Sequence, residues 1–185
     1  MYRTCYTRIM VHSRPFRFAA ELHAPLPDRS WADSARELEA LGYSTLFVPD
    51  HFDEGLGPIA SLAAAARDGG AQALVLVGDA VSQFHLPLLS EVFTALRDAA
   101  PVRAYVPGNH ELWSRDAHTA ALYERALPKL CEEHGWHYLD AGPVVVDGVA
   151  LVGNIGWYDY SMTDRERFAD FPVALGADIL KAMRG

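Results

Sequence analysis

Two short apolar runs, each followed by glycine and a residue type that binds metals, constrain the fold of this chain most. The first run, 74–77, leads into Gly78-Asp79, and the second, 102–106, leads into Pro107-Gly108-Asn109-His110-Glu111. Apolar runs that stop in this way are typical of buried parallel strands. The amphipathic stretch 85–100 between them predicts a connecting helix, so we expect a βαβ unit. Its strand ends should place Asp79 and Asn109 side by side, at the edge where open α/β sheets bind ligands.

The residue types at these strand ends suit divalent cations. A carboxylate such as Asp79 can bridge two hard cations, and the amide oxygen of Asn109 can fill a coordination position without adding charge. Gly78 and Gly108 allow a close approach of the backbone, because they carry no Cβ. His110 is placed to protonate a leaving oxygen or to bind a phosphate. The pattern favours phosphoryl transfer, in which two cations about 3.5–4 Å apart clamp the attacking and leaving oxygens.

The pairing of Gly78-Asp79 with Gly108-Asn109-His110-Glu111 resembles the calcineurin-like metallophosphoesterases. The likeness runs from about Ala66 to the C-terminus and includes the stretch Gly156-Trp157-Tyr158-Asp159-Tyr160-Ser161. It implies an α/β fold with a mainly parallel sheet flanked by helices, as part of an αββα sandwich. It also implies Mn, Fe or Zn ions held by Asp79 and Asn109, with Asp79 bridging, and hydrolysis of a phosphate mono- or diester. His110 would donate the proton, and Glu111 or a nearby backbone group would orient its ring.

The likeness is incomplete at both ends. The family's late histidine and its G-H-x-H motif are missing, because no histidine follows His137. The opening D-x-H motif is also missing, and its nearest substitute is Glu21-Leu22-His23. Residues two apart on a strand share a side, so Glu21 and His23 can reach one metal, whereas the adjacent Asp50 and His51 point apart. We therefore expect a two-metal site short of ligands, with weak binding and low or no activity unless Glu21, His23 or Asp50 compensates.

The first part of the chain has a different likeness. Residues 34–51, Ser-Ala-Arg-Glu-Leu-Glu-Ala-Leu-Gly-Tyr-Ser-Thr-Leu-Phe-Val-Pro-Asp-His, resemble the start of the luciferase-like monooxygenases, especially those that use the deazaflavin F420. The match covers about 15–66, which is two of the eight βα units of such a barrel. Two units cannot form the cofactor mouth that eight loops build, so we expect no stable F420 or flavin binding. Two alternatives to a phosphoesterase stay open: a fragment of such an oxidoreductase, or an inactive fusion domain.

The chain thus divides into three predicted parts: a disordered extension over 1–14, a βαβ unit over 15–66, and an incomplete phosphoesterase-like domain over 67–185. We expect strands ending at His23, Val48, Val77 and Val106 to share one sheet, with the N-terminal unit replacing the family's missing first strand.

The sequence also predicts where helices and turns lie. A helix is expected to start at Ser30 and to end at Gly42. Further elements are predicted as a helix over 117–134 kinked at Pro128, a strand over 136–139, a hairpin over 143–155 turning at Asp147-Gly148, and a helix over 164–183.

The composition of the chain limits the kinds of molecule that it is expected to bind. The chain has 185 residues and a net charge of −8, which argues against a general nucleic-acid binder. Cys5 and Cys131 form no motif, so a reduced cytoplasmic setting is expected, and no apolar run is long enough to span a membrane. The predicted partner is a small phosphoester. The other histidines are expected in surface or capping roles (His85, His118, His134 and His137), and Trp113 and Trp157 either wall a pocket or pack in the core.

Overall fold

The computed structural model describes residues 16–49, 57–81, 85–114 and 117–156. The helix predicted over 164–183, the N-terminal extension, Asp50, His51 and Trp157 lie outside these ranges. In the described part, helices and strands alternate as expected for the α/β class. The strands are β1 (Phe18–Glu21), β2 (Tyr43–Phe47), β3 (Ala73–Val77), β4 (Val102–Val106), β5 (His137–Tyr138), β6 (Val144–Val146) and β7 (Val149–Leu151). The α-helices are α1 (Trp31–Ala40), α2 (Pro58–Gly69), α3 (Leu86–Ala95), α4 (Thr119–Ala121) and α5 (Leu127–His134), with η1 (His110–Leu112) a 3-10 turn and η2 (Leu122–Ala126) a π turn.

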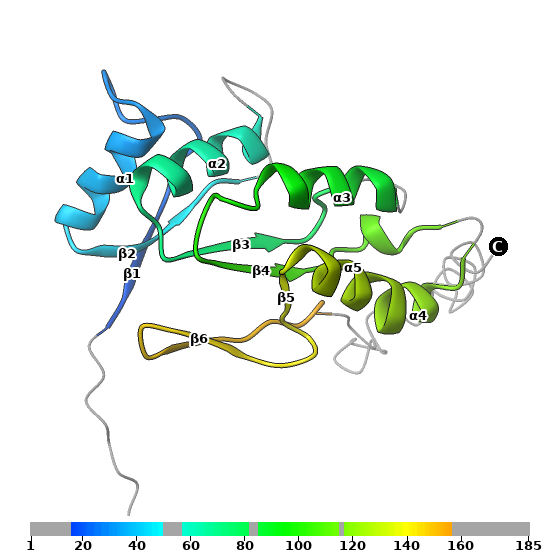
Figure 1. The fold of residues 1–185 in the computed structure, drawn as a ribbon. Helices are drawn as coiled ribbons and strands as arrows, with labels where there is room; N and C mark the ends of the chain where they lie inside the picture. Colours follow the sequence, from blue (N-terminus) through cyan, green and yellow to red (C-terminus); the bar gives the residue numbers. More distant parts are fainter. Residues whose placement is uncertain (1–15, 50–56, 82–84, 115–116, 157–185) are drawn as a thin grey trace, which may run out of the picture.

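The larger sheet consists of the parallel strands β3, β4 and β5, in that order. One face lies against helices α2, α3 and α5, and the other lies against the β6–β7 hairpin (Figure 1). The alternation along the strands explains this division: Leu76 and Tyr105 belong to the helix-side core, whereas Ala104 and Val106 belong to the hairpin-side core. Parallel sheets are normally covered on both faces in this way.

Aromatic side chains fill the helix-side core. Phe93 of α3 is fully buried, stacks on Trp136 at 4.5 Å between ring centroids, and meets Tyr105 edge-on at 5.2 Å. Burial, and after it the nearby Glu111 carboxylate, raises the pKa of the Tyr105 phenol well above its usual range. The phenol is therefore neutral at every pH at which the protein would be studied.

The hairpin faces the larger sheet, because its residues Val144 and Leu151 pack against the core cluster that contains Ala104 and Val106 of β4. Its turn residues Asp147 (φ 47°) and Gly148 (φ 75°) both adopt the left-handed conformation of a type I′ turn, which confirms the hairpin predicted from Asp-Gly. Just past β7, a Cβ on Gly153 would lie 2.4 Å from Val106 Cγ2. The chain therefore passes directly over the end of β4, next to the predicted site.

The prediction of one continuous sheet is wrong. Strands β1 and β2 pair in parallel with each other and form a sheet of their own, separate from β3–β4–β5. Strand β2 leaves four of its five residues exposed, so it lacks the two apolar faces that a strand inside a parallel sheet needs. The N-terminal unit is instead connected through helices: a Cβ on Gly69 of α2 would lie 3.1 Å from Ala35 Cβ of α1, and Ala66 of α2 packs into the main core. It therefore does not replace a missing first strand.

The predicted helix ends are largely confirmed. The Ser30 side chain accepts the Asp33 N–H at the start of α1, and Gly42 (φ 94°) follows its end. The predicted helix over 117–134 is interrupted before Pro128, where η2 makes a π turn. Proline has no N–H and its ring crowds the preceding turn, which accounts for the irregularity there. Gly135 (φ 68°) ends α5 as expected.

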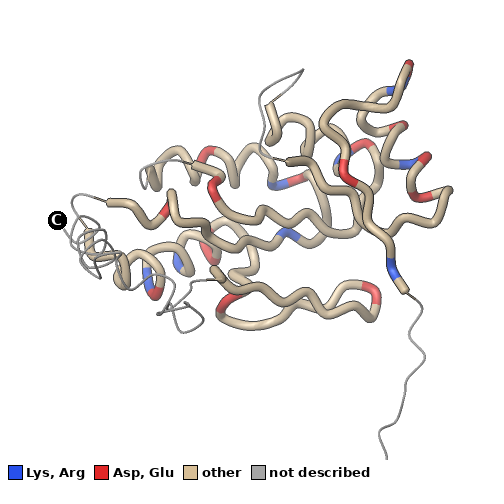
Figure 2. The backbone as a smooth tube through the Cα atoms, turned by 180° about the vertical axis from the view of Figure 1, so that it is seen from behind, with Lys and Arg blue, Asp and Glu red and all other residues tan. Residues whose placement is uncertain are grey.

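Charged residues are spread over the described chain, and Figure 2 shows Lys and Arg dispersed among several elements instead of collected on one of them. Within the described ranges, no helix has both the length and the apolarity needed to cross a membrane.

Candidate functional site

The carboxyl ends of β3 and β4 lie in step. Val77 is paired with Val106, and the Gly78 N–H donates to the Val106 carbonyl at 2.8 Å. Gly78 (φ 70°) and Asp79 (φ 51°) then turn in left-handed conformations. An aspartate at positive φ is uncommon, and here it directs the chain across the end of β4. The prediction that the two strand ends carrying Asp79 and Asn109 lie side by side, at one edge of the sheet, is therefore confirmed.

The two loops touch through glycine. A Cβ on Gly108 would lie 2.1 Å from Asp79 Oδ1 and 2.6 Å from its backbone nitrogen, and one on Gly78 would lie 2.9 Å from the Gly108 Cα. No real side chain fits at such distances. The close approach expected of these glycines is thus between the loops themselves.

The Asp79 carboxylate lies across the second loop. Its Oδ1 accepts the backbone N–H of His110 at 3.0 Å. Asp79 and Asn109 are both exposed, and His110 is partly buried. The structure therefore gathers the three predicted residues at one exposed edge of the sheet, and what they bind stays a prediction.

His110 stacks on Trp113. The ring centroids are 4.2 Å apart and the planes 26° apart, with Trp113 42% exposed. Residues three apart lie on the same side of a 3-10 turn, so η1 puts both rings on the outer side. Trp113 is therefore not a core residue: its exposed ring stacks on His110, the predicted general acid.

Glu111 points the other way, into the protein. It is fully buried, and its two oxygens accept backbone N–H groups from Asp79, Val81 and Gly108. The expected role for Glu111, orienting the His110 ring, is therefore corrected: its carboxylate is used by the backbone of the two loops. Two of the three donors lie some thirty residues earlier in the chain, so no local pattern predicted this orientation.

Glu21 and His23, the substitutes for the missing D-x-H motif, lie elsewhere. They are at and just past the end of β1, in the smaller sheet, and pair with each other at 3.2 Å with about 60% of each side chain exposed. The described ranges contain no group of three or more His, Cys, Asp and Glu side chains that could hold a metal ion. Asp79 and Asn109 have oxygen donors that suit a divalent cation. Glu21 and His23 lie in a different sheet, so the structure does not place them as further ligands of the same cation.

A third strand end carries an acid that the sequence prediction passed over. Asp140 follows β5, on the same edge of the sheet, and its Oδ1 accepts the Asn154 side-chain N–H at 2.9 Å. Burial, followed by the hydrogen bond to Asp140 and its charge, raises the pKa of Tyr123 to about 12. The signal was its position two residues past a strand end, the same position that Asp79 takes after β3.

Three of the other histidines have structural contacts. His85 and His118 accept backbone N–H groups at the starts of α3 and α4, which confirms the capping roles expected of them. His134 of α5 lies 2.9 Å from the Ser90 hydroxyl and 3.4 Å from that of Thr94, so it connects α5 with α3.

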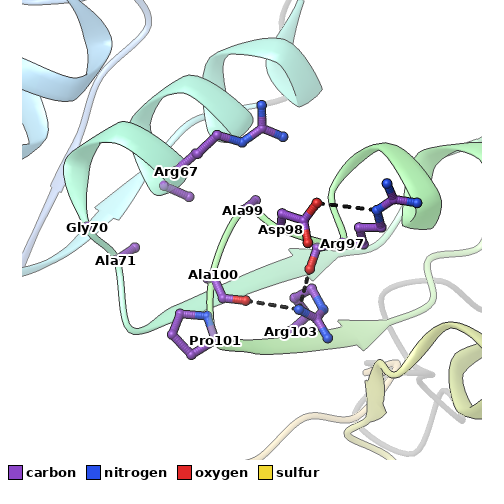
Figure 3. Close-up of a pocket in the computed structure, with 10 residues that line it drawn as sticks. Arg67, Gly70, Ala71, Arg97, Asp98, Ala99, Ala100, Pro101 and Arg103 are labelled. Carbon is purple, nitrogen blue, oxygen red and sulfur yellow. Dashed lines mark hydrogen bonds and ion pairs between the residues drawn. The ribbon is translucent and has the colours of Figure 1, made fainter.

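A hollow at the opposite, amino end of the sheet contains three arginines, Arg67, Arg97 and Arg103 (Figure 3). The Arg103 guanidinium donates to the carbonyls of Arg97, Ala100 and Gly135, and Arg97 pairs with Asp98. These groups hold the loop before β4 and do not converge on a common point in the hollow.

No protein-family model, curated protein or solved structure matches this chain.

Proposed function

We propose that this chain is a divalent-metal-dependent phosphoesterase acting on a phosphate mono- or diester. The observation that supports this most is the Asp79 carboxylate lying across the 108–110 turn, with Oδ1 on the His110 N–H at 3.0 Å. A carboxylate, an amide and an imidazole at one exposed sheet edge form a donor and acid set suited to phosphoryl transfer.

Asp79 and Asn109 would hold the cation, with Mn²⁺, Fe²⁺ and Zn²⁺ all compatible with their oxygen donors and a nearby imidazole. A bound cation would supply Lewis acidity toward the phosphoryl oxygens. Two protein donors are few for even one ion, since Mn²⁺-type sites take about six ligands. We therefore expect weak metal binding, filled out by water, and slow turnover.

His110 would act as the general acid. A water oxygen forms the new bond to phosphorus and releases its proton to solvent, while the bond from phosphorus to the leaving oxygen breaks. The imidazolium of His110 gives its proton to that oxygen, so the alcohol leaves neutral. Stacking on Trp113 at 4.2 Å fixes the ring for this transfer.

The test is hydrolysis of p-nitrophenyl phosphate and its bis-ester, with Mn²⁺ added and then chelated. Asp79→Asn should abolish activity, because it removes the negative charge that Asp79 alone of the two proposed ligands supplies to the cation. Asp147→Asn is the matched control, since it makes the same change at an exposed residue with nearly the same backbone angle, φ 47° against 51°. His110→Ala should lower kcat by roughly 10²–10⁴-fold, and His137→Ala, at an exposed position, should not.

Activity that persists both in chelator and in Asp79→Asn would refute the metal-dependent proposal. The oxidoreductase alternative is tested on the same sample by fluorescence titration with F420 and flavin. Only two parallel strands, β1 and β2, represent the barrel-like part among the described residues, so we expect no micromolar binding.

A further inference from the structure

Glu111 is fully buried, although the nearby residues Asp79 and Asn109 are exposed. Burying a carboxylate is costly unless its oxygens receive hydrogen bonds. Among the described residues, its oxygens accept backbone N–H groups of the two loops that carry Asp79 and Asn109, and the Tyr105 phenol also lies close to it. The buried side chain is therefore tied to the geometry of the proposed site.

One oxygen of Glu111 joins the two loops. Oε2 accepts the Asp79 N–H at 2.9 Å and the Gly108 N–H at 2.8 Å, one donor from each loop. Oε1 accepts the Val81 N–H at 3.1 Å and so holds the far side of the first loop. Without this acceptor, these three N–H groups would lose their hydrogen-bond partner, because donors cannot bond to one another.

We propose that Glu111 is a positioning residue that fixes the separation and orientation of Asp79 and Asn109, and through them the affinity for a divalent cation. Its consequence for metal binding rests on the proposed function, whereas the loop clamp does not. A glutamine has the same size but offers one acceptor oxygen and an NH₂ group, which would face N–H donors. The carboxylate is thus chemically required at this position, beyond filling space.

The clamp itself is tested by amide hydrogen exchange, which needs no metal and no substrate. In the wild-type protein the N–H groups of Asp79, Val81 and Gly108 should exchange as slowly as those of β3 and β4, although they lie in loops. In Glu111→Gln these three should exchange much faster, while the amides of β4 keep their protection. Exchange of the three wild-type amides as fast as that of the exposed Gly142 would overturn the proposal even if the variant did not fold.

The effect on the site is tested by Mn²⁺ titration of the same proteins. Loss of a group that orients metal ligands typically costs roughly 10- to 100-fold in affinity, and we expect Glu111→Gln to raise the Kd for Mn²⁺ by that factor. Cys131→Ala is the control: Cys131 is buried in α5 and belongs to neither loop, so the change should lower stability and leave the Kd unchanged.

The outcomes separate the two proposals. If the wild-type protein bound no Mn²⁺, the proposed function would fail, and loss of the three protected amides in Glu111→Gln would still establish the clamp. If the wild type bound Mn²⁺ and Glu111→Gln bound it equally well, the positioning role would be wrong and the proposed function would stand. An equal rise in Kd in Cys131→Ala would mean that the effect in Glu111→Gln comes from general destabilisation. That result would also overturn the positioning role.

Discussion

The two parallel sheets among the described residues are built from similar strand-helix units but are buried very differently. In the β3–β5 sheet both faces are covered, and Tyr105 and Ala104 at its centre are fully buried. In the β1–β2 sheet most residues are exposed, and Phe47 keeps 53% of its surface in water. Parallel pairing alone therefore does not make a core in this molecule; coverage of both faces does.

This difference decides which predicted ligands the fold can hold in place. Asp79 follows a covered strand, and its loop is fixed by contacts with Gly108 and by the buried Glu111 carboxylate. Glu21 ends an exposed strand, and its partner is the equally exposed His23. Exposed ion pairs contribute little energy, so this pair positions Glu21 far less firmly than the buried contacts position Asp79.

The largest predicted effect compares one aromatic residue from each region. Phe93→Ala removes a fully buried ring that stacks on Trp136, and should lower the free energy of unfolding by about 3–5 kcal/mol. Phe47→Ala should change it by about 0.5 kcal/mol or less, because the side chain is half exposed. Urea denaturation followed by circular dichroism measures both. A loss at Phe47 equal to that at Phe93 would show that the smaller sheet is covered in solution.

The next effect concerns the contact between the loops. Gly108→Ala places a methyl group 2.1 Å from Asp79 Oδ1, so the loops must separate, at a cost of roughly 1–3 kcal/mol, and Mn²⁺-dependent activity should be lost. Gly142→Ala is the matched control, since a Cβ there meets nothing within 4 Å. Thermal unfolding and the phosphodiester assay report the two consequences separately. Wild-type behaviour of Gly108→Ala would mean that the loops are not in contact.

The features that follow from local sequence were predictable. Helix α1 begins after Ser30 and ends before Gly42, and Asp147-Gly148 forms the predicted turn. The strand ends at Val77 and Val106 are paired, as expected. Features that depend on distant partners were not. The separation of the two sheets reflects how much of β2 stays uncovered, which its sequence does not state, and the inward orientation of Glu111 depends on donors some thirty residues earlier in the chain.

The two regions should also differ in how their stability depends on pH. In the core, burial raises the pKa of the Cys131 thiol to about 12, from a usual value of 9.0. A raised pKa means that the folded state retains the proton more tightly, so this contribution is complete below about pH 9 and declines as the pH rises toward 12. Unfolding midpoints measured from pH 8 to 10.5 should fall less steeply in Cys131→Ala than in the wild type. Identical slopes would place the thiol in contact with water.

The smallest effect belongs to the N-terminal region and has the opposite sign. Asp33 is exposed, and its pKa is lowered from 3.8 first by the hydrogen bond from the Ser30 hydroxyl and then by that from Arg36. A lowered pKa means that its contribution is complete above about pH 4 and is lost as the pH falls through the folded-state value. In Ser30→Ala the Asp33 pKa, followed by the side-chain carboxyl ¹³C shift, should rise toward 3.8, while the Cys131 thiol is unaffected. An Asp33 titration that did not move in Ser30→Ala would assign the shift to Arg36, and Arg36→Gln would then have to produce the rise.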